Sequence, residues 1–239
     1  MRYLIRFSYD GTLFHGFQRQ KNVKNVQGLL EQTLSGYFGQ DILIKGSGRT
    51  DAGVHAKCQC AHFDISKKVT WKDIKCINKM LNGEIVINNL KLVDNNFHAR
   101  HDVKKKTYVY KINVGKYKSN YEGYYYQIKY DLDIKKMREA SKVFVGVHDY
   151  RNFVSGYRDD YESVIYNIKI SKFGNILTFK FVGAGFYRYM VRHLVGALVD
   201  VGKGKVDINT IYGMIDNKEF TKKLCVVPAC GLYLTDIKY

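Results

Sequence analysis

The sequence predicts an α+β protein made of two tandem split-βαβ units, of the ferredoxin-like or RRM-like kind, whose antiparallel sheets join around a central basic cleft. Strand and helix patterns follow one another in the order β-α-β-β-α-β twice along the chain. The formal net charge of the chain is +17, which is why the expected cleft is basic. We therefore expect an N-terminal domain over residues 1–103 and a C-terminal domain over residues 104–239.

Local signals mark the elements of the first half. Apolar residues alternate along 3–10, which is typical of a strand. Asn25 and Gly39 flank residues of helical spacing, and Thr70 with Asp73 resembles a capping box at the start of a second helix. The expected order is a strand over 3–10, a loop over 12–22, a helix over 26–37, strands over 42–45 and 58–63, a helix over 70–81 and a strand over 85–92.

The second half repeats this order without obvious sequence identity to the first. A strand over 106–114 has tyrosines on alternate positions, and Asp133 and Gly146 mark the ends of a helix. The remaining expected elements are an extra extended piece over 124–129, strands over 163–171 and 175–182, a long helix over 186–201, a short one over 208–215 and a closing strand over 231–239.

Composition indicates a polyanionic partner. Lys and Arg number 39 against 22 Asp and Glu, and nucleic acid is the leading partner for such an excess, although solvated lysines on an ordinary enzyme are the alternative. Five cysteines without a Cys-x-x-Cys motif are typical of a reducing compartment. There is no apolar signal core or run long enough for a membrane span, so we expect a cytoplasmic protein without membrane association.

A glycine-rich loop, Gly46–His55, lies between two of the expected strands. It lacks the Gly-Lys-Ser/Thr and following helix of a Walker loop, and the third glycine and helix of a dinucleotide fingerprint. Arg49 and Asp51, two residues apart, would point to the same side in extended backbone and could contact one ligand. The alternative is that Asp51 only caps amides of its own turn.

Three further groups are candidate sites. Tyr108 and Tyr110 alternate in a strand preceded by Lys104, Lys105 and Lys106, a pattern that suits base stacking as well as an ordinary core. Arg188 and Arg192 would share a face of the long helix, either for a ligand or as a solvated stripe. Residues His55, Cys58, Cys60 and His62 are too widely spaced along one strand for a tetrahedral zinc site, so no metal is expected.

Several motifs together resemble the tRNA pseudouridine synthase A family. The resemblance covers nearly the whole chain in order, with two departures: Asn82 stands where the family usually has proline, and little tail follows the last strand. The matching segments are Tyr9-Asp10-Gly11, Gly16-Phe17-Gln18-Arg19-Gln20, Asn25-Val26-Gln27, Gly48–His55, Phe97-His98-Ala99-Arg100, Lys106-Thr107-Tyr108-Val109-Tyr110, Phe186, Met190-Val191-Arg192, Val195-Gly196, Val201-Gly202 and Gly231-Leu232-Tyr233-Leu234.

The resemblance implies an isomerase of tRNA processing that converts uridine to pseudouridine at positions 38–40 of the anticodon stem-loop. It implies a homodimer without cofactor or metal, in which each tRNA contacts both subunits. By position, Asp51 would be the nucleophile, Tyr108 would pack on the uracil, Arg192 would pair with the aspartate, and Arg49 would occupy the space of the flipped-out base. Further RNA contacts are expected from Arg19, Lys104, Lys105, Lys106 and Arg188.

The chemistry accounts for these residue types. Moving the ribose bond from N1 to C5 of uracil requires the glycosidic bond to be broken and remade, and a carboxylate can add covalently to ribose C1′ or to uracil C6. The uridine must first leave its stack, at a cost of a few kcal/mol. The alternative function is a non-catalytic RNA-binding protein of the same architecture, which would have no need for Asp51. A phosphate-handling enzyme is disfavoured because phosphate loop and metal carboxylates are both missing.

Overall fold

A computed structural model describes residues 1–216 and 225–239. The chain divides into two compact units, the first made of Met1–Lys104 with Tyr233–Tyr239 and the second of Lys105–Leu232. Both mix helices with strands that pair mostly antiparallel, as expected for an α+β protein. In the described part of the chain, no helix has the length and apolar character needed to cross a membrane.

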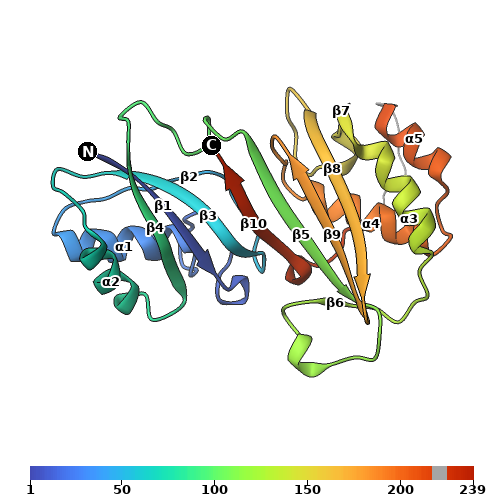
Figure 1. Cartoon of the computed structure of the whole chain (residues 1–239), viewed down its shortest axis with the longest axis horizontal. Coiled ribbons are helices and arrows are strands. Elements are labelled where there is room, and N and C mark those ends of the chain that lie inside the picture. Colours follow the sequence, from blue (N-terminus) through green and yellow to red (C-terminus); the bar gives the residue numbers. More distant parts are fainter. Residues whose placement is uncertain (217–224) are drawn as a thin grey trace. The chain divides into compact units, whose positions relative to one another are not determined.

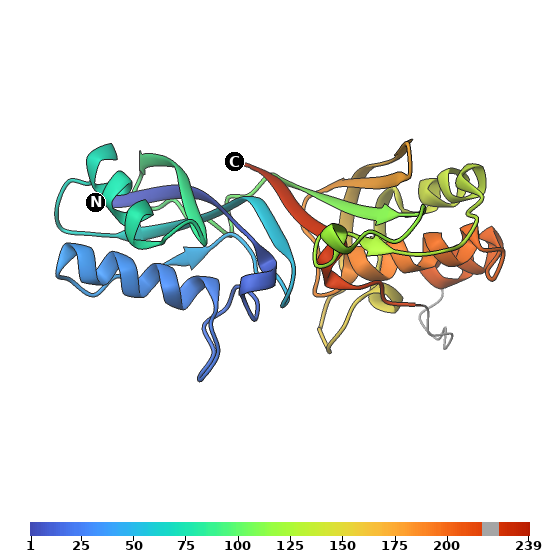
Figure 2. The same ribbon diagram turned by 90° about the horizontal axis from the view of Figure 1, so that it is seen from below.

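The first unit is a sheet with two helices (Figure 1). In sequence order its elements are β1 (Arg2–Tyr9), α1 (Val26–Phe38), β2 (Lys45–Gly46), β3 (His55–Asp64), α2 (Trp71–Met80), β4 (Ile85–Val93) and, from the end of the chain, β10 (Leu232–Lys238). Strand β1 pairs antiparallel with both β3 and β4, while β3 pairs antiparallel with β2 and in parallel with β10. Helix α1 runs along one face of this sheet (Figures 1 and 2).

The helices of the first unit begin and end where the sequence predicts. The Asn25 side chain accepts a hydrogen bond from the Gly28 amide, and Gly39 adopts the left-handed conformation that closes α1. Thr70 and Asp73 form a reciprocal capping box at α2. Local capping chemistry therefore fixes both helices.

The second unit combines strands with helices α3, α4 and α5 (Figure 1). Its elements are β5 (Lys105–Asn113), β6 (Tyr126–Gln127), α3 (Ile134–Ser141), β7 (Gly146–Asp149), β8 (Glu162–Phe173), β9 (Ile176–Gly183), α4 (Met190–Gly202) and α5 (Ile208–Asp216). The strands lie in the order β5-β9-β8-β7 with antiparallel pairing throughout, and β6 adds a short parallel pair to β5. Aromatic residues of β5 and β9, among them Tyr110 and Phe179, are fully buried.

Several expectations differ from the structure. The helix expected to end at Gly146 ends at Ser141, and Gly146 begins β7, which was not predicted. Three further differences concern the strand over 42–45, the closing strand and the long helix. The strand over 42–45 is confined to Lys45–Gly46, because the Ile42 and Ile44 amides donate instead to the side chains of Ser35 and Glu31 on α1. The closing strand, expected in the C-terminal domain, belongs to the first unit, where it pairs with the start of β3.

The third difference is the long helix, for which the predicted start at residue 186 is wrong. Helix α4 begins at Met190, because Tyr189 before it has a φ of +62°, a left-handed conformation that interrupts helical backbone. Arg188 therefore lies outside the helix, and the predicted helical face shared by Arg188 and Arg192 does not exist.

Candidate active site

The Asp51 loop connects β2 to β3 and contains a tight turn. The Val54 amide donates to the Asp51 carbonyl oxygen at 3.2 Å, and Gly53 within this turn has a φ of +78°. Asp51 is half-buried, whereas Arg49 is exposed. A glycine at position 53 is required because other residues rarely adopt this conformation.

The end of β1 and the segment that follows it form hydrogen bonds with the loop. The Phe17 amide donates to the Thr50 carbonyl oxygen at 3.1 Å, and the Tyr9 hydroxyl and Thr50 Oγ1 share a hydrogen bond of 2.8 Å. Gly16 has a φ of +92°, and a Cβ there would lie 2.9 Å from the Thr50 oxygen. Burial raises the pKa of Tyr9 to about 12, so its hydroxyl stays protonated at neutral pH.

The far side of the loop is fixed by β3. Gln59 donates from Nε2 to the Gly48 carbonyl at 3.1 Å and accepts from the Ser47 hydroxyl at 2.7 Å. His55 Nδ1 accepts from the Gly11 amide at 3.1 Å, and its ring stacks on Tyr233 with centroids 4.5 Å apart. Because both flanks are anchored, the loop presents Asp51 on a backbone with little freedom.

Tyr108 and Arg192 both lie in the second unit. Tyr108, on β5, is 8 % exposed and meets Phe186 edge to face with ring centroids 5.2 Å apart. Arg192, on the first turn of α4, donates from Nε to the Val227 carbonyl at 2.8 Å. Tyr110, the other tyrosine of the predicted pair, is fully buried and donates its hydroxyl to Pro228, so it belongs to the core.

The guanidinium groups of Arg188 and Arg192 both pack against the ring of Tyr189. They do not share a helical face, as the sequence had predicted. The guanidinium carbon of Arg188 lies 5.0 Å from the ring centroid of Tyr189, and that of Arg192 lies 4.5 Å from it. Such contacts contribute about 0.5–2 kcal/mol each and restrict both arginines. The sequence carried no signal for this role of Tyr189, since its backbone conformation depends on the surrounding fold.

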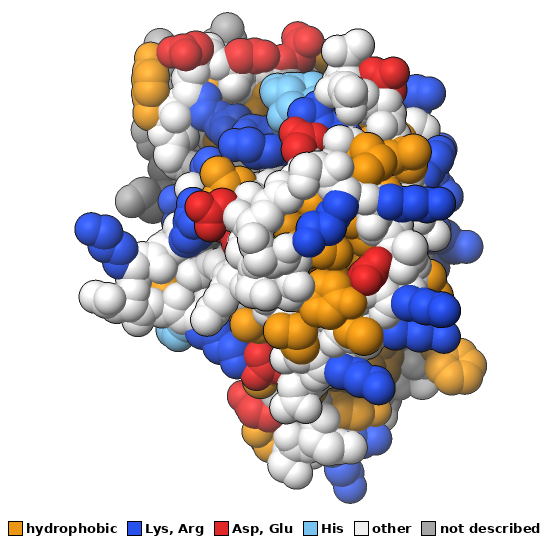
Figure 3. Space-filling view, turned by 90° about the vertical axis from the view of Figure 1, so that its left-hand side faces the viewer, with side chains coloured by type: hydrophobic (Ala, Val, Ile, Leu, Met, Phe, Trp, Pro, Cys, Tyr) orange, Lys and Arg blue, Asp and Glu red, His pale blue; other side chains and the backbone are white. Residues whose placement is uncertain are grey.

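The other predicted RNA contacts vary in exposure. Arg19 is 59 % exposed, and its guanidinium lies 3.1 Å from the buried carboxylate of Glu31. Lys104, Lys105 and Arg188 are exposed, and Lys106 is half-buried. Lys and Arg side chains also line one edge of the face seen in Figure 3, where hydrophobic side chains occupy the centre.

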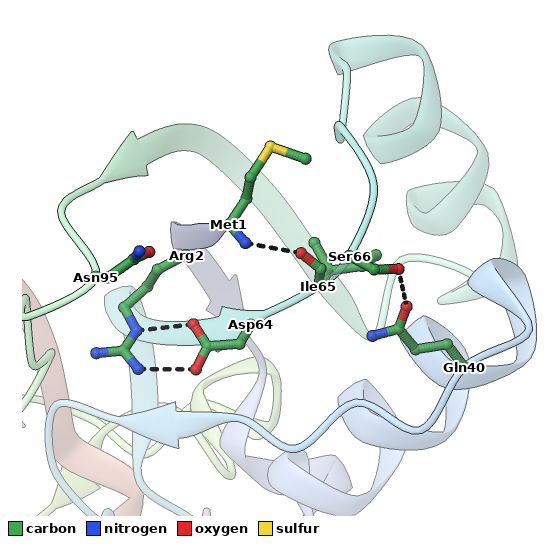
Figure 4. Close-up of a pocket in the computed structure, with 7 residues that line it drawn as sticks. All are labelled: Met1, Arg2, Gln40, Asp64, Ile65, Ser66 and Asn95. Carbon is green, nitrogen blue, oxygen red and sulfur yellow. Dashed lines mark hydrogen bonds and ion pairs between the residues drawn. The ribbon is translucent and has the colours of Figure 1, made fainter.

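Two depressions in the first unit lie away from the Asp51 loop. The larger, of about 420 Å³, is lined by residues from the start of β1 and the end of β3 (Figure 4). Most of its polar groups are internally paired: Arg2 with Asp64, the N-terminal ammonium with the Ile65 carbonyl, and Ser66 with Gln40. Asp64 is nine residues along β3 from His55, about 30 Å at about 3.3 Å per residue. This depression is therefore not part of the Asp51 site.

Residues that support Asp51 were largely missed by sequence reasoning. Tyr9, Gly11 and Gly16 belong to quoted motifs, but no role followed from their spacing. Their partners, Thr50 and His55, are 34 to 44 residues distant in sequence, as the pairs Gly16–Thr50 and Gly11–His55 show. Only the presence of these residues in motifs of the family resemblance pointed to their importance.

Comparison with known proteins identifies the family. A family model described as tRNA pseudouridine synthase matches residues 5–116 and 140–239. The chain belongs to the tRNA pseudouridine synthase family. The match includes Asp51, Tyr108 and Arg192.

Relatives of this family are similar over their full length. The protein named tRNA pseudouridine synthase A from Lactobacillus helveticus is 37 % identical, over 100 % of this chain and 94 % of its own. Those of Mycoplasma genitalium and Pseudothermotoga lettingae are also 37 % identical, over 100 % of this chain and 98 % and 99 % of theirs. A solved Cbf5-Nop10-Gar1 complex contains a chain with a TM-score of 0.36 at 13 % identity, over 72 % of this chain and 40 % of that one.

Proposed function

We propose that this member of the tRNA pseudouridine synthase family is an isomerase that converts uridine to pseudouridine in the anticodon stem-loop of tRNA, at positions 38–40. The loop that carries Asp51 is anchored on both flanks and lacks the features of a phosphate-binding loop, and this is the observation that carries the proposal. Full-length similarity to proteins named tRNA pseudouridine synthase A supports the substrate class.

In the proposed reaction Asp51 is the nucleophile. The bond between ribose C1′ and uracil N1 breaks, a bond between C1′ and C5 forms, C5 loses a proton and N1 gains one. Covalent addition of the carboxylate, to ribose C1′ or to uracil C6, divides this exchange into easier steps. The carboxylate must be ionised, and pairing with the guanidinium of Arg192 would favour that state.

Two side chains would compensate the unstacking of the target. A uridine in a stem must leave its stack, which costs a few kcal/mol. Stacking of Tyr108 on the extruded uracil contributes about 1–3 kcal/mol, and Arg49, exposed beside Asp51, would fill the vacated space. The proposal requires the two units to present these residues to the same nucleotide.

The remaining assignments concern assembly and RNA contact. We propose a homodimer in which each tRNA touches both subunits, acting in the cytoplasm. Arg19, Lys104, Lys105, Lys106 and Arg188 would contact the phosphate backbone, and the joined sheets of the two split-βαβ halves would form a basic floor under the RNA.

The test compares wild type with Asp51→Asn on a tRNA transcript that carries tritium at uracil C5. Wild type should release tritium to water, because C5 loses its proton, and the variant should release none while it binds tRNA with unchanged affinity. Asp131→Asn, which removes the same charge at an exposed position of the second unit, is the matched control and should remain active. No tritium release by either protein would leave only the RNA-binding function, and equal release by both would remove Asp51 as the nucleophile.

A further inference from the structure

A second depression of the first unit, of about 400 Å³, has the features of a binding site. It is lined by residues of β1, β2 and β3 and of the segment that follows β4, among them Arg2, Lys45, His62 and His98. His62 is seven residues along β3 from His55, about 23 Å at about 3.3 Å per residue. The depression thus lies far along β3 from the His55 end of the Asp51 loop, whereas Lys45 of its lining directly precedes Gly46 at the other end of the loop.

One ring nitrogen of His62 is a hydrogen-bond donor. The side chain is 3 % exposed, and its Nδ1 accepts a hydrogen bond from the Ala99 amide at 3.1 Å. A ring nitrogen that accepts carries no proton, so the proton of the neutral imidazole is on Nε2. Among the described residues, no group accepts a hydrogen bond from that Nε2. This donor is therefore available to a ligand or to water.

His98, which is half-buried, supplies a second Nε2 donor. Its Nδ1 accepts from the amides of Arg100 and His101 at 3.1 and 3.3 Å, which also places the ring proton on Nε2. The rings of His62 and His98 are 4.9 Å apart between centroids. Lys45 of β2 is directly opposite His62 in the antiparallel pairing, so its side chain lies on the same face of the sheet.

The charges around these donors favour an anion. Asp64 is bound by Arg2 through two hydrogen bonds of 2.8 Å, so these charges compensate each other (Figure 4). Burial and then the charges of Arg2, His98 and Lys45 lower the pKa of His62 to about 4, against the opposing effect of Asp64. The pKa of His98 is also lowered, by burial and then by His101, Arg2 and Lys45, with Asp102 opposing. Asp41, the other carboxylate of the lining, is exposed to solvent.

The same hydrogen bonds argue against a metal ion. A metal would need the lone pair of each Nε2, and the ring proton would then have to sit on Nδ1, where backbone amides already donate. The depression therefore offers hydrogen-bond donors, and its ligand must carry hydrogen-bond acceptors.

We propose that this depression binds a phosphate group, held by the Nε2 protons of His62 and His98 and by the ammonium of Lys45. The existence of the phosphate site does not depend on the proposed function. The further assignment of that phosphate to the backbone of a bound RNA rests on the proposed function. A phosphodiester bound there would anchor the RNA far along β3 from the reacting nucleotide.

The test follows the imidazole resonances of the full-length protein by NMR. Inorganic phosphate, added at constant ionic strength, should shift the His62 and His98 signals to saturation and leave that of His148, in the second unit, unchanged. Lys45→Ala should weaken phosphate binding at least tenfold. Lys91→Ala is the matched control, because Lys91 is exposed opposite Leu4 on the same face but does not line the depression.

A second titration identifies the source of the phosphate. A tRNA anticodon stem-loop that shifts the same signals, and competes with inorganic phosphate, supports an RNA phosphodiester; saturation by inorganic phosphate alone supports a free phosphate or nucleotide. No saturable shift with either probe, or equal weakening by Lys45→Ala and Lys91→Ala, overturns the site. Asp51→Asn should keep the phosphate response, so a failed activity and a failed phosphate site are distinguishable.

Discussion

The hydroxyl oxygen of Tyr9 lies 2.8 Å from Oγ1 of Thr50, the residue directly before Asp51. Tyr9 is the last residue of β1 and is 7 % exposed. Because β1 is paired on both sides, by β3 and by β4, this hydrogen bond ties the proposed catalytic loop to an interior strand of the sheet.

Tyr9→Phe should therefore impair catalysis more than binding. Loss of one buried hydrogen bond costs about 0.5–1.5 kcal/mol in the free energy of unfolding. A small displacement of the carboxylate should lower kcat about tenfold with little change in KM for tRNA. Tyr3→Phe is the control, since the Tyr3 hydroxyl, on the same strand, accepts from the Val69 amide at 3.0 Å. Tritium release and urea unfolding are the measurements, and an equal fall of kcat in both variants would contradict a positioning role.

Gly16→Ala should disturb the same loop through sterics. Gly16 has a φ of +92°, and the new Cβ would meet the Thr50 carbonyl oxygen at 2.9 Å. We expect a loss of about 1–3 kcal/mol in the free energy of unfolding, together with a lower kcat. Gly36→Ala, in α1 with nothing within 4 Å of its Cβ, should instead stabilise by up to about 1 kcal/mol. Thermal unfolding of the two variants measures these changes in stability. Similar effects of Gly16→Ala and Gly36→Ala would contradict the steric role of Gly16.

The sequence could predict what local chemistry determines. Asn25, Gly39 and the Thr70–Asp73 capping box mark the ends of α1 and α2, and each of these signals acts within a few residues. The glycine loop around Asp51 was also recognisable, because Gly53 satisfies a conformational requirement of its own turn.

The errors arise where distant contacts override local pattern. Ile42 and Ile44 alternate like a strand, but their amides are satisfied by side chains of α1 that no local pattern specifies. Tyr189 is an ordinary helix residue by sequence, yet it takes a left-handed conformation between Arg188 and Arg192. The Tyr9–Thr50 hydrogen bond spans 41 residues, so only the fold could show which side chain supports Asp51.

Arg192→Lys tests the proposed catalytic role of Arg192 in the second unit. The substitution keeps the charge but removes the Nε donor that bonds Val227 at 2.8 Å, and it loses the planar contact with Tyr189. We expect kcat to fall about 10²-fold or more, as for loss of a positioned charge-stabilising donor. Arg138→Lys is matched, because Arg138 donates from Nε to the Ile170 carbonyl at 3.1 Å elsewhere in this unit. Both variants should lose similar stability, so equal activity of the two in the tritium assay would remove the proposed role of Arg192.

His62 should make stability depend on pH. Its pKa is lowered, chiefly by burial, to about 4, whereas an unfolded chain takes up this proton near its ordinary value of 6.5. Between these two values the unfolded state binds more protons than the native state, so stability should fall as pH decreases from about 6.5 to 4 and change little further through this group below 4. His62→Gln cannot titrate, and its stability should decline less over the same interval, although His98 and His193, whose pKa values are also lowered, still contribute. Urea unfolding midpoints at several pH values measure this difference, and parallel curves for the variant and wild type would show that the His62 pKa is the same in the native and unfolded states.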